Sequence, residues 1–239
     1  MFASARSSRA LPRLVAWAGA VTFFLSLAYF LYSYAITFGM TAADGAYVTS
    51  ITWNVALFTV FAMHHSLCAR LRVRAWVART CPPGLERSFY VWVASLLFIA
   101  VCALWRPVPG VAWVAEGATL WALRFVQVVG VWLTLKSAAL LDVLELSGVR
   151  QAEQGPAPAT EFKTRGPYGW VRHPIYAGWF LMVLGASPMT MTRLVFAAAS
   201  CAYLVAAIPF EEQSLREASG GGYDRYATQV RWKLVPGVY

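Results

Sequence analysis

The stretch that decides the fold is LVAWAGAVTFFLSLAYFLYSYAITF, residues 14–38. It carries no charged residue and exceeds the run of about 20 apolar residues that a transmembrane helix needs. A secretory signal peptide has a shorter apolar core, of about 7–15 residues, followed by a small-residue cleavage site, and no clear cleavage site follows this stretch. The stretch therefore predicts an uncleaved membrane-spanning helix.

The composition of the whole chain points the same way. Hydrophobic residues make up 59% of the 239 residues and charged residues only 13%, whereas a soluble domain carries about 25% charged residues. Disorder is excluded because disordered chains are polar and poor in aromatic residues, and 15% of this chain is aromatic. The chain is therefore expected to be an integral membrane protein.

Further apolar runs extend this interpretation along the chain. They cover residues 48–68, 88–105, 118–141, 175–188 and 191–210. The last two are shorter and closely spaced, which predicts a helical hairpin whose first helix is tilted or reaches only part of the way across. We expect an all-α polytopic bundle of five to six transmembrane helices. Residues 1–150 form an N-terminal four-helix membrane region and residues 151–239 a C-terminal region.

The net charge of +9 follows from this topology. In a soluble protein it would suggest nucleic acid, but cytoplasmic loops of membrane proteins collect Lys and Arg. With six helices, sixteen of the 20 basic residues share one side: Arg6, Arg9, Arg13, Arg70, Arg72, Arg74, Arg79, Arg87, Arg150, Lys163, Arg165, Arg172, Arg216, Arg225, Arg231 and Lys233. Arg106 and Arg193 fall in the opposite loops. We therefore expect both termini to be cytoplasmic and no nucleic-acid partner.

Several chemistries have no sequence signal. The four cysteines, at positions 68, 81, 102 and 201, form no CxxC motif and no zinc-ligand spacing with histidine, so neither disulfides nor a metal site is expected. A soluble methyltransferase or dehydrogenase would need a glycine-rich turn between a strand and a helix, and Gly220-Gly221-Gly222 follows a predicted helix instead.

The first polar cluster lies in the segment EFKTRGPYGWVRHPIY, residues 161–176. Pro174 suits the first turn of a helix, where its missing N–H would have no partner. Arg172 and His173 then stand at the helix N-terminus, which favours an anion. The alternative is a basic membrane-interface anchor followed by a helix cap.

The second cluster is Glu211-Glu212, directly after the last apolar run. One interpretation is a solvated helix start in which Glu212 pairs with Arg216 at i,i+4. The other is a carboxylate that binds a cationic ligand. Because the two clusters lie on the same side of the hairpin, together they suit a zwitterionic ligand such as an amino-acid-like cofactor.

The third cluster is His64-His65, near the end of the second run. Ionisable residues in a membrane are candidates for function. Adjacent histidines point about 100° apart on a helix, so one metal or ligand is not expected to take both. The alternative is that each histidine is hydrogen-bonded across the bundle.

The C-terminal motifs resemble a known family. RHPIYAG at residues 172–178, EEQSL at 211–215 and GYDRY at 222–226 are similar to the ordered motifs of the isoprenylcysteine carboxyl methyltransferase superfamily of integral membrane enzymes. The resemblance implies S-adenosylmethionine as cofactor, held by Tyr168, His173, Pro174, Ile175, Tyr176, Glu211 and Glu212. It also aligns residues 160–163 with a cofactor-contacting stretch. The family's substrate-handling Arg, four residues before the Glu, is replaced by Ala207.

The N-terminal half resembles the bacterial methanethiol S-methyltransferases and NnrU-like proteins. The similarity lies in HSLCAR at residues 65–70, ERSFYV at 86–91 and LELSGVRQ at 144–151. It implies a bacterial inner-membrane enzyme that methylates a small apolar or volatile thiol such as methanethiol. Membrane lipid is the other expected partner, and the sequence leaves the oligomeric state open.

A thiol must lose its proton before it attacks a methyl group, and a nearby His or Arg assists this. The candidates are His65, Arg172 and Arg231. One alternative is methylation of another acceptor, which would be an isoprenylcysteine or lipid carboxylate or a phospholipid amine. Another is a non-catalytic or haem-associated NnrU-like protein that uses His64, His65 or His173. The last is a sterol-reductase-like reaction.

Overall fold

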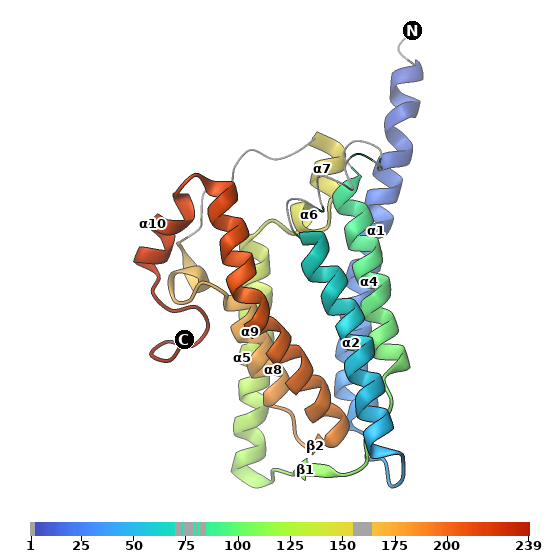
Figure 1. Ribbon diagram of the computed structural model, residues 1–239, viewed down its shortest axis with the longest axis vertical. Coiled ribbons are helices and arrows are strands. Elements are labelled where there is room, and N and C mark those ends of the chain that lie inside the picture. Colours follow the sequence, from blue (N-terminus) through green and yellow to red (C-terminus); the bar gives the residue numbers. More distant parts are fainter. Residues whose placement is uncertain (1–2, 70–72, 74–78, 80, 82–84, 155–163) are drawn as a thin grey trace. The chain divides into compact units, whose positions relative to one another are not determined.

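The computed structural model describes residues 3–69, 73, 79, 81, 85–154 and 164–239, and these residues are mainly helical, as the apolar runs predict (Figure 1). The long helices are α1 (Ala3–Ala35), α2 (Tyr47–Ala69), α4 (Glu86–Leu104), α5 (Gly117–Leu140), α8 (Pro174–Leu184) and α9 (Met191–Ser219). The short ones are η1 (Thr37–Gly39), α6 (Val143–Leu146), α7 (Val149–Gln154), η2 (Gly166–Gly169) and α10 (Gly222–Gln229). Two short strands, β1 (Val111–Trp113) and β2 (Met189–Thr190), pair antiparallel.

In the described part of the chain, four helical segments are long and apolar enough to cross a membrane: Leu11–Gly39, α4, α5 and α9. Helix α2 is 23 residues long but does not join them, because Asn54, His64 and His65 lower its hydropathy. Helix α8 has 11 residues, which span about 16 Å of a hydrocarbon core about 30 Å thick. It is therefore too short to cross the core by itself, and five to six spans stay a prediction.

The chain divides into two compact units. Unit 1 comprises Met1–Tyr32, Thr59–Leu104 and Leu141–Pro158. Within it, the indole of Trp92 on α4 donates to the carbonyl of Val15 on α1 at 3.1 Å, and the buried Phe30 and Phe98 rings lie 5.4 Å apart. Unit 2 comprises Ser33–Phe58, Trp105–Leu140 and Ala159–Tyr239.

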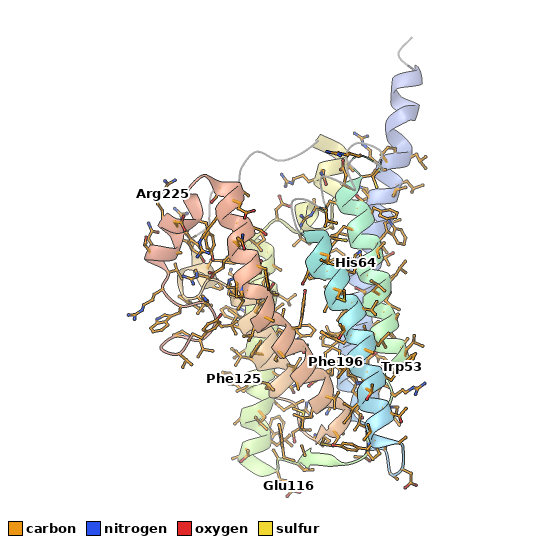
Figure 2. The ribbon with its side chains drawn as sticks, in the orientation of Figure 1. Trp53, His64, Glu116, Phe125, Phe196 and Arg225 are labelled. Carbon is orange, nitrogen blue, oxygen red and sulfur yellow. The ribbon has the colours of Figure 1, made fainter. Side chains whose placement is uncertain are left out.

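Unit 2 is built around Phe196 of α9, which is fully buried and labelled in Figure 2. The rings of Tyr34, Phe38, Phe58 and Trp105 lie 5.2–5.9 Å from it. Aromatic rings at such separations contribute about 0.5–1.5 kcal/mol per pair beyond burial. This cluster joins α9 to the end of α1, to α2 and to the chain after α4, which brings segments far apart in sequence into one unit.

Two glycines let α8 pack closely against α5. A Cβ atom at Gly130 of α5 would lie 2.6 Å from the carbonyl oxygen of Gly178, and one at Gly178 would lie 2.7 Å from the carbonyl oxygen of Gly130. Small residues allow such close backbone approach between membrane helices. Gly178 is the last residue of the RHPIYAG motif, so the motif also determines how α8 sits on α5.

Arg193 lies in the first turn of α9 rather than in the loop where the sequence suggested it. Its side chain is buried and donates to the carbonyls of Tyr34, Ala35 and Pro188. These carbonyls include the C-terminal end of α1, where a helix dipole favours a cation. Arg193 therefore holds the end of α1 against the start of α9.

Helix α9 continues past its apolar part to Ser219. Glu211 and Glu212 are therefore inside this helix and not beyond its end. Gly220 and Gly221 follow with φ values of 54° and 89°, a left-handed conformation that glycine adopts without a Cβ penalty. The resulting turn folds α10 back against α9.

Candidate active site in unit 2

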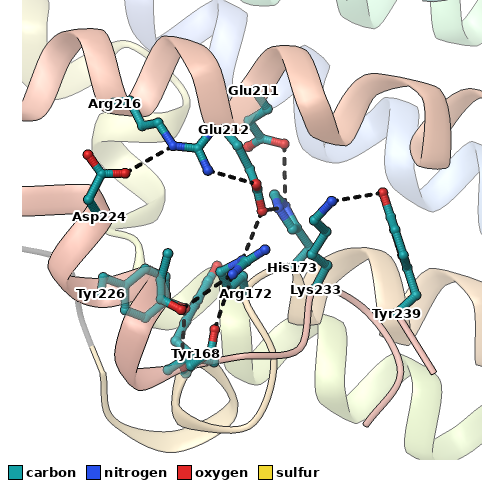
Figure 3. A network of polar contacts seen from close by, with 12 residues as sticks. Tyr168, Arg172, His173, Glu211, Glu212, Arg216, Asp224, Tyr226, Lys233 and Tyr239 are labelled. Atoms are coloured by element: carbon teal, nitrogen blue, oxygen red, sulfur yellow. Dashed lines mark hydrogen bonds and ion pairs between the residues drawn. The ribbon is translucent and has the colours of Figure 1, made fainter. Parts of the chain in front are cut away.

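The two C-terminal motifs meet in unit 2, where the start of α8 faces the polar part of α9 (Figure 3). His173 is the residue before α8 and is 6% exposed. Its Nε2 lies 3.3 Å from Glu212 Oε1, and its Nδ1 lies 3.5 Å from Glu211 Oε2. The imidazole therefore bridges both carboxylates of the EE motif.

Glu212 is the inner carboxylate, 3% exposed. Arg172 Nε lies 2.9 Å from Glu212 Oε1, and Arg216 Nη2 lies 3.4 Å from Oε2. The i,i+4 pair is therefore present, but the solvated helix start of which it was part is wrong, because Glu212 is buried within α9. Burying a carboxylate is expensive unless it is paired and hydrogen-bonded. With two arginines and His173 around it (Figure 3), Glu212 is a structural anion inside the cluster.

Arg172 is also held by the end of α10. Its Nη1 donates to the carbonyls of Val230 and Ala227 at 3.3 and 3.5 Å. Its side chain is only 9% exposed. The guanidinium therefore joins α8, α9 and the chain after α10 at one point.

Glu211 is the outer carboxylate, with a side chain 44% exposed. The Tyr176 hydroxyl donates to its Oε2 at 2.8 Å, and the Tyr176 ring stacks on His173 with centroids 5.3 Å apart. Tyr176 and His173 thus fix one edge of a carboxylate whose remaining surface faces outward. Such a group suits a cationic ligand.

The electrostatics of His173 follow from its two neighbours. Burial alone would lower its pKa, but hydrogen bonds and Coulomb attraction from Glu211 and Glu212 outweigh burial, so the pKa of His173 is raised above its ordinary 6.5. The two carboxylates therefore favour the protonated imidazolium, which can donate to both of them.

Tyrosines form the other wall of the cluster. The Tyr226 hydroxyl donates to the carbonyl of Tyr168 at 2.9 Å. Burial raises the pKa of Tyr226 to about 12, and burial likewise raises the pKa values of Tyr168 and Tyr223. These phenols stay protonated at physiological pH, and the three side chains contribute aromatic surface to the cluster.

The C-terminal tail pairs with the backbone that precedes α8. The backbone N–H groups of Arg172 and His173 donate to the carbonyls of Trp232 and Lys233, both at 2.9 Å. The sequence did not predict this short backbone pairing. The motifs quoted from the sequence end at residue 226, before the two carbonyls.

Most of the predicted site residues come together here: Tyr168, Arg172, His173, Tyr176, Glu211 and Glu212. Pro174 and Ile175 form the first turn of α8. Arg231 is exposed, and its guanidinium stacks over Trp232 at 5.0 Å. Residues 160–163 lie outside the described residues.

His65 belongs to unit 1. Its Nδ1 lies 2.7 Å from the hydroxyl of Tyr90 on α4, and its ring stacks on Phe61. The His64 ring stacks on the Tyr90 ring, with the centroids 5.6 Å apart. Tyr90 is a polar partner that the sequence did not single out, although it lies in the quoted ERSFYV stretch. Across the described ranges, no three His, Cys, Asp or Glu residues gather as metal ligands would.

Comparison with known proteins identifies relatives along most of the chain. The family model of the isoprenylcysteine carboxyl methyltransferase (ICMT) family matches residues 151–217. The chain is 35% identical to a methanethiol S-methyltransferase of Crocosphaera subtropica, over 77% of this chain and 74% of that protein. It is 38% identical to one from Mycobacterium tuberculosis, over 77% and 78%. Human Nurim is 32% identical, over 72% and 71%. No solved structure matches.

Proposed function

The chain belongs to the isoprenylcysteine carboxyl methyltransferase family of membrane methyltransferases, and from this premise we propose that it transfers the methyl group of S-adenosylmethionine to a small thiol such as methanethiol. The observation that carries the proposal is that Glu211 and Glu212 have different surroundings. Glu212 is neutralised inside the protein by Arg172 and His173. Glu211 presents an oriented, half-exposed carboxylate beside the start of α8.

The residues of the cluster fit such a methyl donor. S-adenosylmethionine, when bound, would supply a methyl group on a sulfonium: a thiolate sulfur bonds to the methyl carbon as the carbon–sulfonium bond breaks, which gives a methyl thioether and S-adenosylhomocysteine. Glu211 would hold the ammonium group of the donor. The N-terminal end of α8, whose dipole favours an anion, would bind its carboxylate. The aromatic faces of Tyr168 and Tyr176 would pack against the rest of the molecule.

The proposed acceptor rests on two observations. The relatives named methanethiol S-methyltransferase extend across both halves of the chain. Ala207 stands four residues before Glu211, where the isoprenylcysteine enzymes have the Arg that handles a carboxylate substrate. Alanine offers no charge to bind that substrate, which favours a neutral thiol over a prenylcysteine carboxylate.

His65 is the proposed base that takes the thiol proton. Its contact with the Tyr90 hydroxyl holds the orientation of the ring, which supports a catalytic imidazole. The rival Arg172 is paired with Glu212, and Arg231 is exposed over Trp232. If His65 is the base, His65→Ala lowers the turnover of a thiol at neutral pH and leaves the affinity for the donor unchanged, whereas full turnover in this variant would exclude the residue.

Donor binding is tested on the purified protein by calorimetry. Glu211→Gln keeps the shape of the side chain and removes its charge, so binding of S-adenosylmethionine is expected to be lost. Glu217→Gln is the matched control, because Glu217 lies on the same helix and bonds to Gln213 at 3.0 Å. Equal binding by the wild type and Glu211→Gln would refute the assigned role.

The acceptor is tested by supplying labelled S-adenosylmethionine and a panel of thiols, lipids and prenylcysteines to membranes that contain the protein. Label in a volatile sulfide supports the thiol. Label only in lipid or in a prenylcysteine ester would replace the thiol with that acceptor while leaving the donor assignment intact. A purified protein that binds haem and no donor would contradict both assignments.

A further inference from the structure

The chain on either side of the cluster carries an exposed surface that the proposed chemistry does not use. We call it the tail surface, and it consists of the following residues: Arg165, Trp170, Arg231, Lys233, Val235, Val238 and Tyr239. Trp170 is 58% exposed, Val235 45% and Val238 78%. Exposed apolar side chains set among basic ones, with Trp and Tyr, are typical of the membrane–water interface.

The tail surface is an ordered part of unit 2. The backbone N–H groups of Lys233 and Leu234 both donate to the carbonyl of Tyr239 at 2.9 Å, which folds the tail back on itself. Leu234 points inward and is 4% exposed. Its neighbour Val235 and the nearby Val238 therefore face outward.

The position of the tail surface relative to the bilayer follows from its attachment. The carbonyls of Trp232 and Lys233 accept from Arg172 and His173, the two residues that precede α8. The apolar part of α8 begins at Pro174, and α8 packs on α5, a candidate membrane span. The tail surface therefore lies where the polar chain gives way to apolar helix, the level of the membrane–water interface. Trp, Tyr, Lys and Arg collect at this level.

The charge of the tail surface selects the kind of lipid. Residues 164–172 and 230–239 contain four basic residues and no acidic residue. Arg172 is internal because it pairs with Glu212. Lys233 Nζ donates to the Tyr239 hydroxyl at 3.2 Å (Figure 3), which uses one of its three N–H groups. The other N–H groups of Lys233 and the guanidinium groups of Arg165 and Arg231 are left for an external partner. Basic side chains next to a bilayer bind the headgroups of anionic phospholipids.

We propose that the tail surface binds anionic phospholipid headgroups and that this contact stabilises the backbone around His173. The link is direct. Lys233 supplies the carbonyl that accepts from His173, and Arg231 precedes Trp232, whose carbonyl accepts from Arg172. Lipid that immobilises residues 231–233 also restricts the opening of these two backbone hydrogen bonds. For its effect on the methyl donor, the inference rests on the proposed function. The lipid contact itself does not.

The experiment is amide hydrogen exchange on the full chain in nanodiscs, with neutral phosphatidylcholine alone or mixed with phosphatidylglycerol. Peptides that cover residues 172–173 should exchange several-fold more slowly with the anionic lipid. The double variant Arg231→Gln/Lys233→Gln should lose this difference. Arg106→Gln is the matched control, because Arg106 belongs to the same unit but stacks over Trp53, away from both segments of the tail surface.

Equal exchange of the wild type in the two lipids would overturn the inference. Persistence of the lipid effect in the double variant would also overturn it, because another surface would then bind the headgroups. Trp170→Ser serves as a second variant if the double variant does not fold, and its loss of the effect would support the inference. If glycerol phosphate in neutral nanodiscs slows exchange as much as the anionic lipid does, a membrane surface is not the ligand.

Exchange is read without any methyl transfer, so the two proposals fail separately. A protein that binds no methyl donor but shows slower exchange in anionic lipid contradicts the proposed function and supports the inference. A protein that binds the donor equally well in both lipids, with unchanged exchange, contradicts only the inference. If both proposals hold, donor affinity is several-fold higher in the anionic nanodiscs.

Discussion

Arg172 Nε lies 2.9 Å from Glu212 Oε1, and the two side chains are 9% and 4% exposed. The pair brings together the residue two before the start of α8 and the polar part of α9. A buried ion pair contributes little net stability against an apolar replacement, but breaking it leaves an uncompensated charge. The pair therefore holds the start of α8 against α9, next to Glu211 and His173.

We predict that Arg172→Met destabilises the protein more than removal of the whole pair. Loss of one partner of a buried pair costs about 3–5 kcal/mol, whereas Arg172→Met combined with Glu212→Leu leaves no buried charge from the pair. Thermal denaturation in detergent should give the lowest midpoint for the single variant and a partial recovery for the double one. A double variant that is no more stable than the single would show that the pair is not the main role of Arg172.

A second prediction concerns the Tyr176 hydroxyl, which donates to Glu211 at 2.8 Å. Tyr176→Phe keeps the ring on His173 and removes this hydrogen bond. Because Glu211 is half-exposed, the loss is about 1 kcal/mol, which weakens donor binding about fivefold. Calorimetry measures it, with Tyr32→Phe as control, since Tyr32 is an exposed tyrosine of α1 in unit 1. Unchanged affinity in Tyr176→Phe would mean that Glu211 does not depend on this contact.

Local sequence patterns predicted much of this structure. The apolar runs placed α2, α4, α5 and α8 to within four residues, because burial in lipid demands an uninterrupted apolar stretch. They missed the polar extensions of two helices: α1 begins at Ala3, 11 residues before its run, and α9 ends at Ser219, nine residues after its run. The proximity of the RHP and EE motifs could be predicted because they lie at the same end of the helical hairpin expected over residues 175–210. The backbone pairing of His173 with Lys233 was missed, because it joins residues about 60 apart through main-chain groups that no side-chain pattern reports. Arg193 was missed for a related reason, since its partners are backbone carbonyls.

The packing of α8 on α5 gives a third prediction. In Gly178→Ala the new Cβ would meet the carbonyl oxygen of Gly130 at 2.7 Å, so the helices must separate. Overpacking of this kind costs about 1–3 kcal/mol and moves His173 away from the carboxylates of α9. Both the thermal midpoint and donor affinity should fall. Ala122→Val, on the exposed face of α5, is the control and should change neither; equal behaviour of the two variants would contradict the close-packing argument.

The last prediction concerns pH. The pKa of His173 is raised because the attraction of Glu211 and Glu212 for the imidazolium exceeds the effect of burial. A group whose pKa is higher in the folded state stabilises the fold fully below its unfolded pKa, here 6.5, and this stability is lost as pH rises through the raised value. The thermal midpoint of the protein should therefore decline as pH increases above 6.5.

His173→Gln isolates this effect, since glutamine still donates a hydrogen bond but does not titrate in this range. The variant should be less stable than the wild type at pH 6 and should lose much of the decline with pH. Donor affinity should follow the same dependence if protonated His173 holds Glu211 in place. A wild-type midpoint that rises through this range, or a slope that survives in His173→Gln, would show that another group controls the stability of unit 2.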